Sequence, residues 1–167
     1  HRDAHDALER ALAAWIGYPR ALLFSTGYMA ATGTLSALLG RHDLCVQDRL
    51  NHACLIDGAR LAEASLQRYR HGDAADAARL LAAQPERRAL LVSDSVFSMD
   101  GDVAPLAELA ALAQRERAWL MVDDAHGVGV LGPQGRGACA AAGLGPEDVP
   151  VWMGTLGKAL GGFGAVI

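Results

Sequence analysis

Residues 118–127, AWLMVDDAHG, decide how the rest of the chain is interpreted. The first five residues are apolar, and a run of this length is typical of a buried β-strand. The carboxylates of Asp123 and Asp124 follow at once, and His126 comes three residues after Asp123. A carboxylate at the mouth of a buried strand is costly unless a positive partner requires it. The stretch therefore predicts a strand with a ligand site at its carboxyl end.

A second stretch, GTLGK at 154–158, places a lone lysine among glycines and apolar residues. Partial desolvation there would favour the neutral, nucleophilic amine. A lysine that forms a Schiff base and an aspartate that keeps a pyridine nitrogen protonated are what pyridoxal phosphate (PLP) requires. Lys158, Asp123 and His126 therefore predict a PLP site. The alternatives are that Lys158 is a solvated surface charge and that Thr155, instead of binding a phosphate, caps a helix.

The composition indicates a soluble globular domain. The 167 residues can bury a substantial core, and 51% of them are hydrophobic against 20% charged. A net charge of −4 offers no basic face, so nucleic acid is not expected as a partner. No apolar run is long enough to span a bilayer, so no membrane contact is expected either. Three widely spaced cysteines favour reduced core residues over disulfides or zinc ligands, and we expect a cytoplasmic protein.

Hydrophobic periodicity divides the chain into alternating strands and helices. The strands are short and apolar and lack strict alternation, which is typical of strands buried on both faces. This predicts an α/β fold with a mostly parallel sheet and helices on both faces. The predicted strands are 21–24, 44–47, 66–69, 89–93, 118–122 and 149–153. The predicted helices are 3–16, 27–39, 73–83 with Asp73 as its cap, 105–115, and one after His52 that reaches Ala64.

The candidate polar residues all follow predicted strands. In parallel sheets, ligands bind beyond the carboxyl ends of the strands, so these residues are expected to share one site. A strand that feeds a glycine at a helix N-terminus also forms an anion site, because free backbone N–H groups point outward there. The candidates are Ser25 and Gly27, His52, Ser98, Asp123 and His126, and Thr155 and Lys158.

Other interpretations of these residues are weaker. Asp123, Asp124 and His126 could bind a metal ion, but few further ligands lie nearby, and we expect no metal. The spacing G-x-G-x-x-G at 127–132 occurs in dinucleotide sites, but Pro133 follows where a helix should start. This is the only support for a nicotinamide-dependent oxidoreductase. Taken alone, His52 could be an ordinary histidine and Ser98 a loop cap.

With these residues identified, the chain resembles the α-oxoamine synthases, which are PLP enzymes of the aspartate-aminotransferase-like fold (fold type I). The motifs that carry the resemblance are FSMDGD at 97–102, DDAHG at 123–127 and TLGK at 155–158. Asp94 stands where family members often have Glu, and Ser95 where Gly is common. The resemblance implies that Lys158 forms the Schiff base, that Asp123 holds the ring nitrogen and that His126 holds the phenolic oxygen. It implies that His52 stacks on the ring and meets the substrate, and that Ser98 contacts the cofactor. Gly27 and Tyr28 would offer backbone groups to the cofactor, and Thr155 would bind its phosphate.

Within the family, the stretches 50–53, 56–61 and 126–132 are most similar to the members that act in biotin synthesis. The resemblance then implies a decarboxylative condensation of L-alanine with a pimeloyl thioester, carried by CoA or by acyl carrier protein. Lys158, His52 and Asp123 would be the catalytic residues. The alternatives are another family member, such as a glycine C-acetyltransferase, and a catalytically silent subunit of the same fold.

The resemblance also bears on the extent of the protein. Family members continue well past the lysine into a small C-terminal domain that supplies an arginine for the substrate carboxylate. We therefore expect residues 1–167 to be part of the PLP-binding large domain, without that C-terminal domain and inactive alone. The resemblance further implies a homodimer with the active site at its interface.

Overall fold

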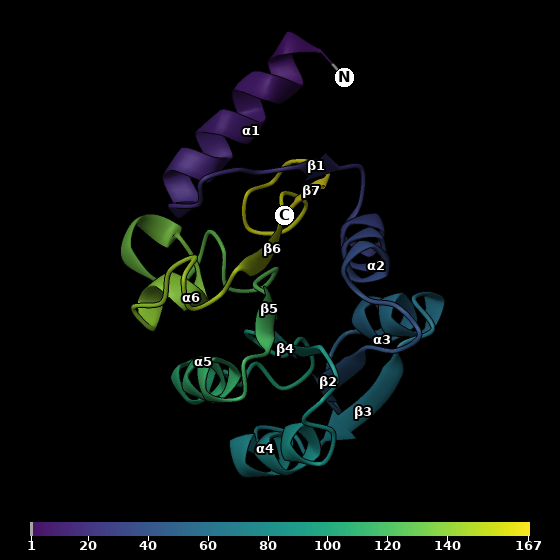
Figure 1. The fold of residues 1–167 in the computed structure, drawn as a ribbon. Helices are drawn as coiled ribbons and strands as arrows, with labels where there is room; N and C mark the ends of the chain where they lie inside the picture. The colour runs from purple at the N-terminus through teal and green to yellow at the C-terminus, as the bar shows by residue number, and fades with distance from the viewer. Residues whose placement is uncertain (1) are drawn as a thin grey trace.

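The computed structural model describes residues 2–167. A central sheet runs through this part of the chain, with helices on both sides (Figure 1). Its seven strands lie in the order β1-β7-β6-β5-β4-β2-β3. The strands β2 to β6 are mutually parallel, whereas β7 pairs antiparallel with β6 and β1. Their bounds are β1 Leu23–Phe24, β2 Leu44–Asp48, β3 Ser65–Tyr69, β4 Ala89–Asp94, β5 Trp119–Asp123, β6 Val151–Thr155 and β7 Ala165–Val166.

The helices cover both faces of the sheet. The helices α2 (Gly27–Leu38) and α3 (Ala53–Leu61) lie on one face, and α4 (Ala74–Ala82), α5 (Leu106–Arg115) and the short α6 (Ala138–Ala141) lie on the other (Figure 1). Two clusters of buried apolar side chains, one on each face, fill the space between helices and sheet. The N-terminal helix α1 (Asp3–Ile16) packs near β1 at one end. This confirms the predicted α/β fold with a mostly parallel, doubly covered sheet.

Local signals place several helix ends where they were predicted. The helix α1 ends at Gly17, whose φ of 92° is left-handed and suits a residue without a Cβ. Asp73 caps α4 by accepting a hydrogen bond from the backbone N–H of Asp76. Thr26 caps α2 in the same way through Met29.

Several elements differ from the prediction. The strand predicted at 149–153 begins instead at Val151, because Pro150 has no N–H to donate to a sheet ladder, and it extends to Thr155 alongside β7. The helix after His52 ends at Leu61 and not at Ala64. The chain turns there through a left-handed residue, Glu63, to enter β3. Neither α6 nor β7 was predicted, since four and two residues are too few to show a repeating hydrophobic pattern.

The register of the parallel strands positions the site. Asp94, the last residue of β4, pairs with Asp123, the last residue of β5, and Asp123 pairs in turn with Met153 of β6. Two carboxylates therefore lie side by side at the carboxyl edge of the sheet. The N-termini of α2 and α3 reach the same edge.

Candidate active site

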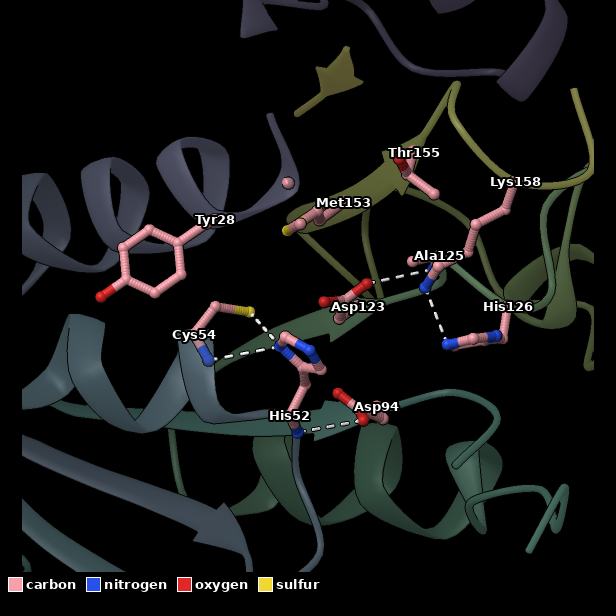
Figure 2. Close-up of a pocket in the computed structure, with 11 residues that line it drawn as sticks. Tyr28, His52, Cys54, Asp94, Asp123, Ala125, His126, Met153, Thr155 and Lys158 are labelled. Atoms are coloured by element: carbon pink, nitrogen blue, oxygen red, sulfur yellow. Dashed lines mark hydrogen bonds between the residues drawn. The ribbon is translucent and has the colours of Figure 1, made fainter. Parts of the chain in front are cut away.

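A cavity of about 200 Å³ opens at the carboxyl edge of the parallel strands. Its lining residues come from the ends of β4, β5 and β6 and from the N-termini of α2 and α3 (Figure 2). Six of the eight candidate residues expected to share one site line it, and Tyr28 lines it as well. The lining consists of Gly27, Tyr28, His52, Cys54, Asp94, Asp123, Ala125, His126, Met153, Thr155 and Lys158.

Ser25 and Ser98 are the candidate residues that do not line this cavity within residues 2–167. Ser98 lies exposed in the loop after β4, one residue beyond the buried Phe97. A short bridge between Val96 and Val103 closes this loop. The contact of Ser98 with a cofactor stays a prediction.

Asp123 faces the cavity and is only 6% exposed. Its Oδ1 accepts a hydrogen bond from the backbone N–H of Ala125 at 3.0 Å. Burial raises the pKa of Asp123, and the Ala125 N–H together with the positive charges of Lys158 and His52 only partly offsets this. A cation placed opposite the other oxygen would complete the environment of this carboxylate.

Asp124 has the opposite arrangement, because its carboxylate points into the protein. It accepts hydrogen bonds from Ser95 Oγ at 2.5 Å, from Trp152 Nε1 at 3.0 Å and from the backbone N–H of Ala138 at 2.9 Å. These donors come from three separate segments, so Asp124 ties them together. The alternative in which Asp123, Asp124 and His126 share a metal ion therefore lacks one of its ligands. In the described range 2–167, no group of three or more His, Cys, Asp or Glu side chains is arranged to hold a metal.

The glycine-rich segment after β5 follows from the burial of Asp124. A Cβ at Gly127 or at Gly137 would overlap the Asp124 carboxylate. Gly137 also has a left-handed φ of 98°. The residues after Gly132 form a 3-10 turn, Pro133–Gly135, in place of the helix that a dinucleotide site requires. The spacing at 127–132 is thus explained by packing.

Asp94 is a site residue that the sequence reasoning did not assign. It is 4% exposed, and its Oδ2 accepts a hydrogen bond from the backbone N–H of His52 at 3.1 Å. Its Oδ1 has no hydrogen-bond partner within residues 2–167. Burial, and then the charge of Asp123, raise the pKa of Asp94 to about 8. Its position directly after the predicted strand 89–93 was the available signal.

Lys158 and His126 form a pair on the opposite side of the cavity from α3 (Figure 2). Nζ of Lys158 lies 2.7 Å from Nε2 of His126. Burial, and then the charges of Lys158 and His52, lower the pKa of His126. The expectation of a partly desolvated lysine is not met in residues 2–167. Lys158 is exposed there, because it follows β6 in a segment, 157–163, that lies at the surface.

The N-terminus of α2 forms a second polar end of the cavity. Gly27 and Tyr28 line it, and their backbone N–H groups donate to no acceptor within residues 2–167. Free amides at a helix N-terminus are suited to an anion such as a phosphate. Thr155, half-buried at the end of β6, donates its hydroxyl to the carbonyl of Gly164 at 3.2 Å and lies beside this end of the cavity.

Comparisons with known proteins agree with this fold. The aminotransferase class I and II family matches residues 1–167. The 8-amino-7-oxononanoate synthase of Alkalilimnicola ehrlichii is 62% identical over 167 residues, which is 100% of this chain and 43% of that protein. The chain thus spans less than half the length of this curated relative.

Two solved structures are similar over 99% of this chain. The structure of SPT (serine palmitoyltransferase) with a PLP internal aldimine is 36% identical, with a TM-score of 0.93 over 42% of that chain. The 8-amino-7-oxononanoate synthase of Francisella tularensis is 35% identical, with a TM-score of 0.87 over 48% of that chain. Since the family match covers every residue of the sequence, the chain belongs to the aminotransferase class I and II family.

Proposed function

We propose that this chain is the PLP-binding part of an acyltransferase that makes 8-amino-7-oxononanoate for biotin biosynthesis. The substrates would be L-alanine and a pimeloyl thioester of CoA or of acyl carrier protein. The 62% identity to an 8-amino-7-oxononanoate synthase supports this activity. The observation that carries the proposal is the meeting of Asp123, His126 and Lys158 with the free amides of α2 around one cavity.

The two ends of the cavity suit the two ends of PLP. The carboxylate of the buried Asp123 forms no ion pair within residues 2–167, and a protonated pyridine nitrogen would supply one. The free amides of Gly27 and Tyr28 suit the phosphate, with Thr155 as a further contact. Between these ends, Lys158 is the single lysine of residues 1–167 and supplies the amine for a Schiff base. When bound, PLP provides an electron sink for negative charge at the α-carbon of an amino acid.

The chain's own residues divide the remaining tasks. Asp123 would stabilise the positive charge of the protonated ring nitrogen, because its second carboxylate oxygen accepts no hydrogen bond within residues 2–167. Nζ of Lys158 is the base proposed to take the α-proton of alanine, and Nε2 of His126, 2.7 Å away, can exchange a proton with it. His52, which enters the cavity from the start of α3, is proposed to stack on the ring and to meet the substrate.

We also propose that the protein acts as a homodimer in the cytoplasm, with this chain as part of its large domain. Tyr28 lines the cavity yet is 51% exposed, and Met29 beside it is 51% exposed. A second subunit would cover such apolar surface at the rim of the site. None of the helices in residues 2–167 has the length and apolar character needed to cross a membrane.

A comparison of turnover with three substrate pairs tests the proposed activity. The full-length protein, loaded with PLP, would be given alanine with pimeloyl-CoA, glycine with acetyl-CoA, or serine with palmitoyl-CoA, and CoA release and product mass would be followed. We expect turnover to be fastest for the first pair. Faster turnover of either other pair would assign the protein to a different activity. PLP binding without turnover of any pair would favour a silent subunit.

A further inference from the structure

His52 is held against the helix that it precedes. It is the N-cap residue of α3, and its backbone is extended, with φ −54° and ψ 143°. The imidazole turns back so that Nδ1 lies 3.3 Å from the backbone nitrogen of Cys54 and 2.9 Å from its Sγ (Figure 2). One ring nitrogen is thus contacted twice by the same residue. The other, Nε2, points away from Cys54.

The direction of these hydrogen bonds follows from the donors. A backbone N–H can only donate, so Nδ1 must present its lone pair to Cys54. Cys54 is 2% exposed, and burial raises the pKa of its thiol to about 12. The thiol therefore keeps its proton and is a donor to the same nitrogen. In its neutral form, the ring then carries its proton on Nε2.

We propose that Cys54 is a positioning residue for His52, which it holds in the Nε2–H tautomer with the N–H turned away from α3. The proposal rests on the proposed function only in giving His52 a role at the cofactor. With Nδ1 occupied, the ring cannot rotate without losing both contacts to Cys54. His52 therefore offers the cavity a fixed ring plane and one donor.

The tautomer can be measured directly by long-range ¹H–¹⁵N NMR correlation on the full-length protein with ¹⁵N-labelled histidine. The His52 signals would be assigned with His52→Gln. Cys54→Ala removes the thiol donor, while Cys54→Ser replaces it with a hydroxyl donor. Cys139→Ala is the matched control, because it removes another buried thiol that does not line the cavity.

We expect wild type, Cys54→Ser and Cys139→Ala to show His52 with its proton on Nε2. In Cys54→Ala the ratio of Nε2–H to Nδ1–H tautomer should fall about fivefold, the equivalent of one ordinary hydrogen bond. A wild-type Nδ1–H tautomer would overturn the proposal even if Cys54→Ala did not fold. So would a Cys54→Ala spectrum equal to that of the control. The measurement needs neither PLP nor substrate, so its failure is distinct from failure of the proposed function.

Discussion

Asp123 turns its carboxylate into the cavity, while Asp124, the next residue, turns its carboxylate into the protein. Asp124 accepts from donors in three segments, and Asp123 accepts only from the N–H of Ala125 within residues 2–167. Alternation of side chains along an extended backbone produces this difference, since neighbouring residues face opposite sides. The pair therefore separates function from stability, and substitution by asparagine tests each role.

Asp123→Asn should abolish the proposed chemistry and leave the fold intact. Asparagine keeps an oxygen for the N–H of Ala125 but removes the negative charge. Hydrogen exchange at the α-carbon of alanine in D₂O, followed by proton NMR, should slow by about 100-fold or more. Because burial raises the pKa of Asp123, the ionised form is unfavourable in the fold. The free energy of unfolding at pH 8 should be unchanged or higher, and an unchanged exchange rate would contradict the assigned role.

Asp124→Asn should instead destabilise the protein. Its side-chain NH₂ cannot accept from Trp152, Ser95 or Ala138, so at least one buried donor loses its partner. We expect a loss of about 2–4 kcal/mol in the free energy of unfolding, measured by urea denaturation. A variant as stable as Asp123→Asn would show that Asp124 does not tie these segments together.

The buried Asp94 should make the cofactor-free protein less stable as pH rises. Its folded pKa, about 8, lies above the ordinary value of an aspartate, so the folded state binds more protons than the unfolded state. Stability contributed by protonated Asp94 is present at low pH and is lost between about pH 4 and pH 8. Asp94→Asn should therefore reduce the difference in unfolding free energy between pH 5 and pH 8 by several kcal/mol. Urea denaturation at pH 5 and pH 8 measures it, and parallel slopes for wild type and variant would contradict the account.

His71 should also stabilise the protein at low pH, but through the charged form of its side chain, whereas Asp94 does so through its neutral form. Nδ1 of His71 lies 3.0 Å from Oδ1 of Asp48, and its Nε2 lies 2.8 Å from Oδ2 of Asp102. The imidazole also contacts the ring of Phe97 in an edge-to-face arrangement. Burial lowers the pKa of His71, but the hydrogen bonds to both carboxylates outweigh it, and the pKa is raised. The contribution is full below about pH 6.5 and is lost as pH rises through the folded pKa.

His71→Gln should therefore cost about 1–2 kcal/mol of unfolding free energy at pH 6 and less at pH 9. Chemical denaturation at the two pH values checks this. Because the comparison is made between variant and wild type, the titration of Asp94 cancels. An equal cost at both pH values would mean that the charged imidazole adds nothing.

The sequence was sufficient for features that depend on neighbouring residues. The helix at 3–16 and the Asp73 cap follow from side-chain period and capping chemistry. The meeting of Asp123, His126 and Lys158 follows from one rule about parallel sheets, that their carboxyl ends share an edge. Each of these needs only local pattern or general topology.

Features that depend on distant segments were not accessible in this way. The role of Asp124 requires Ser95, Ala138 and Trp152 to meet, and no local sequence pattern predicts that contact. The strand β7 is two residues long and forms only because β6 and β1 flank it. Asp94 was left in a loop because its pairing with Asp123 extends β4 by one residue.

The most direct test of the central claim is the site at which PLP attaches. The full-length protein would be mixed with PLP, reduced with borohydride, digested and mapped by mass spectrometry, with Lys158→Arg as the control. The account predicts one PLP adduct, on Lys158, and none within residues 1–167 of the control. An adduct elsewhere, or a protein that takes up no PLP, would contradict the proposed site.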